Sequence, residues 1–147
     1  MRVALGSDHA GLALKQVLID YFKDKGIAYS DFGTFCERAA DYPDISFPVI
    51  RGVASGEFEF GILICGTGIG VSMVANRFQE IRAALCGDPY TARCSREHNN
   101  ANILTLGSRV VGPGLALEIV EVFLRTPFLG GRHQRRLDKI KLLSDPS

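Results

Sequence analysis

The stretch that decides the fold is GILICGTGIGVS, residues 61–72. An unbroken apolar run ends at Cys65, and glycines follow at positions 66, 68 and 70. A short apolar run of this kind is typical of a strand that is buried on both faces of a parallel sheet. The residues therefore predict a strand, a glycine-rich turn and the start of a helix, with a single thiol where the strand ends.

The same alternation of short apolar runs and helical stretches continues along the chain. Four further runs predict strands, at residues 2–7, 27–32, 81–86 and 102–107. Helical spacing and helix-end signals predict helices at residues 10–26, 42–56, 70–78, 89–99, 112–125 and about 133–143. Strands that alternate with helices predict an α/β fold, here a Rossmann-like three-layer α/β/α sandwich with a five-stranded parallel sheet.

Length and composition exclude several classes of protein. A chain of 147 residues with 46% hydrophobic and 22% charged residues fits one domain, which we expect to span residues 1–147. The net charge of +1 gives no indication of a nucleic-acid or membrane partner. We see no signal peptide, and no two of the four cysteines have Cys-x-x-Cys spacing. We therefore expect free thiols, no metal and a cytoplasmic location.

Several kinds of site could use the turn after Cys65. A nucleotide site is disfavoured, because the third glycine comes one residue early for a dinucleotide fingerprint and no P-loop lysine follows Gly70. Exposed amides at the start of a helix would bind an anion, although a tight turn without a ligand remains open. Thiols near a helix N-terminus have a lowered pKa. A thiolate base beside an anion hole would suit removal of a proton next to a carbonyl, whereas a redox role lacks a nearby second cysteine.

Other polar residues fall where this fold places its ligands. Asp8, His9 and Arg109 follow predicted strands, and ligands of open parallel sheets bind beyond the carboxyl ends of the strands. His98 ends a predicted helix, either as a proton donor or as a simple C-terminal cap. Arg132 and Arg136 share a helix face and match a phosphate, although a solvated basic face is the alternative. Asp8 could likewise serve only as a helix cap.

These residues predict an enzyme that acts on a small phosphorylated substrate with a carbonyl group. Two alternatives from other classes remain open. One is a protein that only binds a sugar phosphate or nucleotide, and the other is a thiol-dependent hydrolase or redox protein.

Six motifs in order carry a resemblance to a known family: GSDHAG, DYPD, ILICGTGIGVSMVANRF, IRAALC, SREHNNANILTLGSRVVG and GGRHQRR. Over nearly its whole length the sequence resembles the sugar-phosphate isomerase family of ribose-5-phosphate isomerase B. That family also contains the subunits of galactose-6-phosphate isomerase and allose-6-phosphate isomerase. The resemblance implies interconversion of D-ribose 5-phosphate and D-ribulose 5-phosphate through a cis-enediolate, in the non-oxidative branch of the pentose phosphate pathway. A six-carbon substrate is the alternative within the family.

The resemblance also implies roles for single residues. Cys65 resembles the general base, Thr67 and His98 the residues that help to open the sugar ring, and Asp8 a contact to the sugar hydroxyls that also shuttles a proton. The remaining implied contacts are the enediolate site at Gly66, Thr67, Gly68, Ile69 and Gly70, the sugar contacts Tyr42 and Asn99, and the phosphate clamp of His9, Arg109, Arg132 and Arg136. One branch of the family uses a glutamate base, but residues 71–74 contain no acidic side chain.

The resemblance further implies an assembly. Members are homodimers or tetramers in which the C-terminal segment of the partner completes each site, so we expect the C-terminal helix to extend to a partner subunit. Neither a cofactor nor a metal is implied.

Overall fold

All five expected strands form in the computed structural model, which describes residues 1–143. They are β1 (Arg2–Ser7), β2 (Ala28–Asp31), β3 (Phe60–Cys65), β4 (Ala83–Leu85) and β5 (Ile103–Gly107). Within the described residues they make one parallel sheet in the order β2-β1-β3-β5-β4. Every residue of β3 and β5 is buried, which explains why these runs, apart from Thr105, contain no polar side chains.

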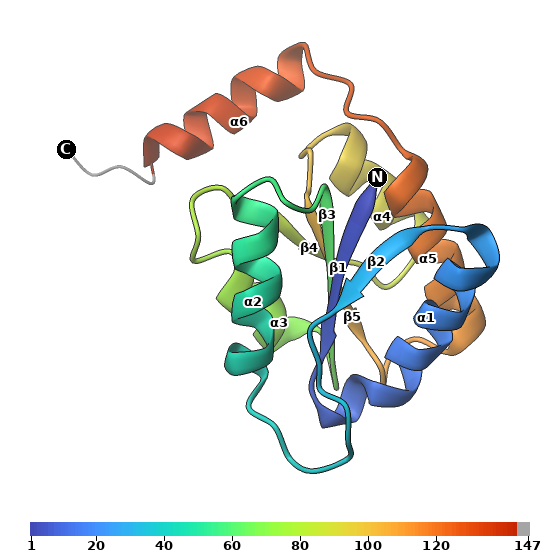
Figure 1. Cartoon of the computed structure of the whole chain (residues 1–147). Coiled ribbons are helices and arrows are strands. Elements are labelled where there is room, and N and C mark those ends of the chain that lie inside the picture. Colours follow the sequence, from blue (N-terminus) through green and yellow to red (C-terminus); the bar gives the residue numbers. More distant parts are fainter. Residues whose placement is uncertain (144–147) are drawn as a thin grey trace.

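The expected helices also form, and they cover both faces of the sheet. They are α1 (Leu12–Lys25), which follows the short 3-10 helix η1 (His9–Gly11), α2 (Tyr42–Ala54), α3 (Ile69–Ala75), α4 (Pro89–Glu97), α5 (Pro113–Arg125) and α6 (Arg132–Leu143). The first face carries α1, α4 and α5, and the second carries α2 and α3 (Figure 1). The predicted three-layer α/β/α sandwich is confirmed. Of the predicted domain 1–147, the last four residues lie outside the described part.

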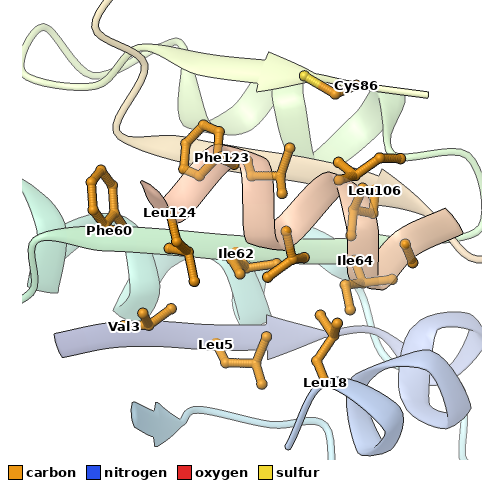
Figure 2. Packing of buried hydrophobic residues seen from close by; sticks show 14 of the residues in the cluster. Val3, Leu5, Leu18, Phe60, Ile62, Ile64, Cys86, Leu106, Phe123 and Leu124 are labelled. Atoms are coloured by element: carbon orange, nitrogen blue, oxygen red, sulfur yellow. The ribbon is translucent and has the colours of Figure 1, made fainter. Parts of the chain in front are cut away.

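Two apolar clusters hold the layers together. On the first face, Leu18 of α1 and Phe123 of α5 pack against Leu5 and Ile62 of the sheet (Figure 2). The rings of Phe60 and Phe123 meet edge to face, with centroids 5.6 Å apart. The second face has a smaller cluster, centred on residues 49–53 of α2 and on Leu63. The sheet is therefore a rigid base for the loops at its edges.

The strand order places the expected ligand crevice at the carboxyl edge of the sheet. After β1 the chain turns into η1 and α1 on one face, whereas after β3 it turns into α3 on the other face. Because these neighbouring strands send their connections to opposite sides, this edge is a topological switch point, and sheets of this kind bind ligands in the crevice beyond the carboxyl ends at such a point. This is the edge at which Cys65 ends β3.

Helix α6 lies at the other end of the molecule, where β1 begins, and stands away from the sheet (Figure 1). Of residues 132–143 only His133 is buried, and the side chains of Leu142 and Leu143 are 76% and 85% exposed. Its predicted extension to a partner subunit stays a prediction. Along residues 1–143, no helix is both long enough and apolar enough to cross a membrane.

Candidate active site

Cys65 sits at the end of β3 inside the glycine-rich turn. Its side chain is buried, and the Gly68 amide donates a hydrogen bond to its sulfur at 3.1 Å. Gly68 has φ +77°, and a Cβ placed there would lie 2.6 Å from Leu85 Cδ1 and 2.8 Å from the backbone carbon of Leu106. Only glycine fits, because a side chain would meet both an unfavourable φ and the end of β5. The turn therefore holds the thiol and its own amides in one fixed piece of backbone.

The ends of three strands are tied together beside this thiol. The Asp8 amide donates to the Ile64 carbonyl at 3.1 Å, which joins the end of β1 to β3. The Ser108 hydroxyl, after β5, donates to the Ala10 carbonyl at 2.8 Å and lies 3.2 Å from the Cys65 carbonyl oxygen. Asp8 and Cys65 therefore border one crevice. The Asp8 carboxylate also accepts a hydrogen bond from the Gly11 amide at 3.1 Å, so the expected helix-capping role of Asp8 is confirmed.

An aromatic ring and a guanidinium border the turn. A Cβ on Gly70 would lie 2.7 Å from Tyr42 Cζ, so the tyrosine ring lies directly against Gly70. A Cβ on Gly66 would lie 3.1 Å from Arg109 Nη1, and the Arg109 amide donates to the Gly66 carbonyl at 3.0 Å. Thr67 and Ile69 between them are exposed. The glycine-rich turn thus has an aromatic ring on one side and a positive charge on another.

His9 joins this group from η1, and a backbone contact sets its tautomer. The Ala40 amide donates to His9 Nδ1 at 3.2 Å. With Nδ1 accepting, the neutral ring carries its proton on Nε2, which is then the nitrogen that can donate to a ligand. Ala40 belongs to the loop between β2 and α2, so the position of this loop decides how His9 is held.

Sequence reasoning missed the residue that anchors this loop. Lys15 is 2% exposed, and its ammonium donates to Asp31 at 2.8 Å and to the Thr34 carbonyl. A signal was present: Lys15 precedes Leu18 and Ile19 by three and four residues, and therefore lies on the buried stripe of α1. A lysine at such a position needs a partner, since an unpaired buried charge is costly.

The other expected site residues gather at the opposite edge of the sheet. His98 ends α4, where its amide donates to the Cys94 carbonyl at 2.9 Å, so its predicted role as a C-terminal cap is confirmed. Asn99 follows it and is exposed. Arg132 and Arg136 lie on α6, whose first turn meets His98 through a ring stack with His133. Within residues 1–143, neither of these arginines nor Arg109 forms an ion pair with a carboxylate.

The two groups lie far apart within one chain. α4 begins beyond the carboxyl end of β4 and runs back along the sheet, so His98 lies where β5 is about to begin. The six residues of β3 separate the two edges by roughly 20 Å at about 3.3 Å per residue. A sugar phosphate is much shorter than this. Ligands of parallel sheets bind beyond the carboxyl ends of the strands, and this rule placed Asp8, His9, Cys65 and Arg109 correctly. It does not apply to His98 and Asn99, which lie at the amino edge.

The other three cysteines lie outside the glycine-rich turn. Along residues 1–143 all four cysteines are free. Cys36 is exposed and Cys94 is half-buried. Cys86 is buried on the face of the sheet opposite to that of Cys65. Burial raises the pKa of Cys86. The predicted free thiols are confirmed.

Comparison with known proteins gives the family. The family model described as Ribose/Galactose Isomerase matches residues 3–140. The putative sugar phosphate isomerase YwlF of Bacillus subtilis is 50% identical over 141 residues, 95% of each chain, and ribose-5-phosphate isomerase B of Escherichia coli is 45% identical over 95% of this chain and 93% of its own. A D-erythrulose-4-phosphate isomerase of Pectobacterium atrosepticum is 39% identical over 95% and 93%.

Comparison with solved structures indicates the same family. The structure of ribose-5-phosphate isomerase B from Clostridium thermocellum superposes with a TM-score of 0.95 at 50% identity, covering 97% of each chain. The match includes the sheet, both helix layers and nearly the whole length of the chain. The chain therefore belongs to the ribose/galactose isomerase family.

Proposed function

We propose that this protein interconverts D-ribose 5-phosphate and D-ribulose 5-phosphate through a cis-enediolate, with Cys65 as the general base. The observation that carries the proposal is the Cys65 sulfur held against the Gly68 amide inside the glycine-rich turn. A base beside preorganised amides is what proton removal next to a carbonyl requires, because the negative charge that forms on oxygen is met by N–H groups already in place. The names and substrates of the relatives support the same reaction class.

The reaction moves two protons and leaves the formula of the sugar unchanged. Cys65, as thiolate, takes the proton from carbon-2 of the open-chain aldose while the oxygen on carbon-1 becomes negative. The amides from Gly66 to Gly70 stabilise that oxygen. The thiol then returns its proton to carbon-1, and the proton of the carbon-2 hydroxyl passes to the carbon-1 oxygen, for which Asp8 is the nearby carboxylate.

The phosphate and the ring-opening groups require a second chain. His9 and Arg109 supply phosphate contacts at the carboxyl edge, whereas His98, Asn99, Arg132 and Arg136 lie at the amino edge of the same sheet. We therefore propose a homodimer in which the amino-edge group of one chain faces the Cys65 crevice of the other. His98, together with Thr67, then opens the furanose ring, and the arginines bind the phosphate as a fork.

The test of the base compares three forms of the protein. Cys65→Ala is expected to lose more than about a hundredfold in turnover of ribose 5-phosphate, while phosphate-dependent binding changes little, because only proton transfer is removed. Cys65→Ser keeps the shape and is expected to lose nearly as much. Near-normal turnover by Cys65→Ala would show that another group is the base.

Chain length of the sugar is the second question. One relative is a D-erythrulose-4-phosphate isomerase, so four-carbon, five-carbon and six-carbon substrates all belong in the comparison. We expect the highest kcat/KM with ribose 5-phosphate when D-erythrose 4-phosphate, D-allose 6-phosphate and D-galactose 6-phosphate are measured beside it. A higher value for one of the others would reassign the substrate and leave the reaction class intact. Binding of all four without turnover would favour a sensor.

A further inference from the structure

The ring of His133 stacks on the ring of His98 at the amino edge of the sheet. The centroids are 4.5 Å apart and the planes differ by 14°. His133 is the buried residue of α6, while His98, on α4, keeps 42% of its side chain exposed. One ring is therefore held inside the protein, and the other lies over it with a face and an edge available to solvent or substrate.

The surroundings of His133 disfavour a proton on its ring. Burial lowers the pKa of His133, and His98, Arg132 and Arg136 lower it further against the smaller opposing effect of Glu97. His133 Nδ1 is buried without a hydrogen-bond partner among the described residues, so a proton placed there would be an unpaired buried charge. Glu97 Oε2 lies 3.9 Å from His98 Nε2. The neutral form of the His133 ring is therefore favoured.

The stack also connects the two elements that carry this group. His133 lies in the first turn of α6, between Arg132 and Arg136, and the chain before α6 is joined to α4 by the Leu129 amide, which donates to the Glu97 carbonyl at 3.1 Å. Holding His98 by its face uses neither of its ring nitrogens. A hydrogen bond to the ring would instead use one of those nitrogens.

We propose that His133 is a positioning residue for His98: by stacking, it fixes the imidazole plane that the ring-opening step uses. This inference rests on the proposed function, in which His98 acts on the sugar ring. It assigns to the histidine of the GGRHQRR motif a role separate from the phosphate contacts of the neighbouring arginines. It also explains why that role needs an aromatic ring rather than a charge.

The experiment is a double-mutant cycle in the full-length protein, with ribose 5-phosphate as substrate. His133→Leu removes the ring, His133→Phe keeps a ring of similar size without nitrogens, and His98→Asn removes the proposed proton donor. We expect His133→Leu to lower kcat roughly tenfold with KM within about twofold, since it disturbs one general acid–base group. His133→Phe should recover kcat to within about threefold of wild type, because the stack survives.

The decisive measurement is the double variant. If His133 acts through His98, adding His133→Leu to His98→Asn costs no further activity, because the ring that it positions is already gone. Proton NMR of His98 checks the contact directly, since its ring resonances should lose their ring-current shift in His133→Leu and retain one in His133→Phe.

Three results would overturn the inference: additive losses in the double variant, an unaffected His133→Leu, or a His133→Phe that is as poor as His133→Leu. A failure of the proposed function gives a distinguishable result, because His98→Asn by itself then keeps wild-type turnover. A His133→Leu chain that does not fold leaves the comparison of His133→Phe with wild type, where a loss beyond threefold counts against stacking as the role.

Discussion

The Gly68 amide and the Cys65 sulfur are joined by a hydrogen bond of 3.1 Å within a single turn, residues 65–68. The proposed base and the proposed anion site are therefore parts of the same short segment of backbone. Any change that moves one moves the other. The geometry of the turn depends on Gly68, whose φ of +77° and close approach to β5 exclude a side chain.

Gly68→Ala is expected to abolish turnover and to destabilise the protein. Gly56→Ala is the matched control, since Gly56 has nearly the same φ, +78°, but a Cβ placed there would meet no atom within 4 Å. Each alanine costs about 1–2 kcal/mol for its left-handed backbone, and Gly68→Ala adds the overlap with Leu85 and Leu106. Loss of the amide arrangement should also reduce kcat by roughly a hundredfold or more. Equal stability and activity of the two variants would contradict this account of the turn.

Arg136→Ala is expected to raise KM more than it lowers kcat. The phosphate does not react, so a contact to it binds substrate and transition state alike, and its removal appears in KM. Arg135→Ala is the control, because the neighbouring residue points about 100° away around α6 and removes the same charge from the chain. Steady-state kinetics with ribose 5-phosphate provide the measurement. An effect of equal size from both arginines would indicate long-range attraction rather than a clamp.

Mixing two inactive variants tests the shared site. In a dimer of one Cys65→Ala chain and one Arg132→Ala chain, one site carries both changes and the other carries neither. Random exchange makes half of the dimers mixed, so activity should recover to about a quarter of wild type. Mass spectrometry under native conditions confirms that exchange has occurred. Sites built from one chain each would stay inactive after complete exchange.

The Lys15–Asp31 pair should matter far more than an exposed pair. Asp31→Asn leaves the Lys15 ammonium buried among neutral groups, such as the Thr34 carbonyl and the Phe35 ring, with no opposite charge, a change that costs about 3–5 kcal/mol for pairs of this kind. Glu121→Gln removes the exposed partner of Arg125, at 3.0 Å, and should cost less than about 1 kcal/mol. Urea unfolding measures both. Adding Lys15→Met to Asp31→Asn should restore part of the stability, and a further loss there would refute the charge explanation.

Much of the fold could be predicted because the apolar runs and helix-end residues agreed with the alternation of strands and helices along the chain. The run ending at Cys65 is apolar at every position, which only burial on both faces explains, and Gly26 ends α1 with φ +65° as its position indicates. The strand expected at 81–86 is shorter, Ala83–Leu85, because it lies at the edge of the sheet with a partner on one side only.

The site was harder to predict, because a sequence motif does not show at which edge of the sheet its residues lie. SREHNN marks His98 and Asn99 as the end of a helix, but it does not say which edge of the sheet that end reaches. The connectivity decides this: a helix between two parallel strands must return to the amino edge. Contacts between distant segments, such as His98 with His133 and Lys15 with Asp31, depend on how the layers pack.

The lowered pKa of His133 predicts how stability depends on pH. Its ordinary value is 6.5, and burial lowers it in the folded protein, so below about pH 6.5 the unfolded chain binds a proton that the folded chain resists. The contribution of neutral His133 is therefore fully present above that pH and is lost as the pH falls through the folded-state pKa. His133→Phe keeps the ring stack and cannot take up this proton. Melting temperatures measured from pH 7.5 to pH 5 should thus fall more steeply for the wild type than for His133→Phe. The other titratable groups are common to both proteins, so their effects cancel in the difference between the two melting temperatures. Parallel curves would show that the surroundings of His133 do not hold it neutral, and the lowered pKa of this ring would then be wrong.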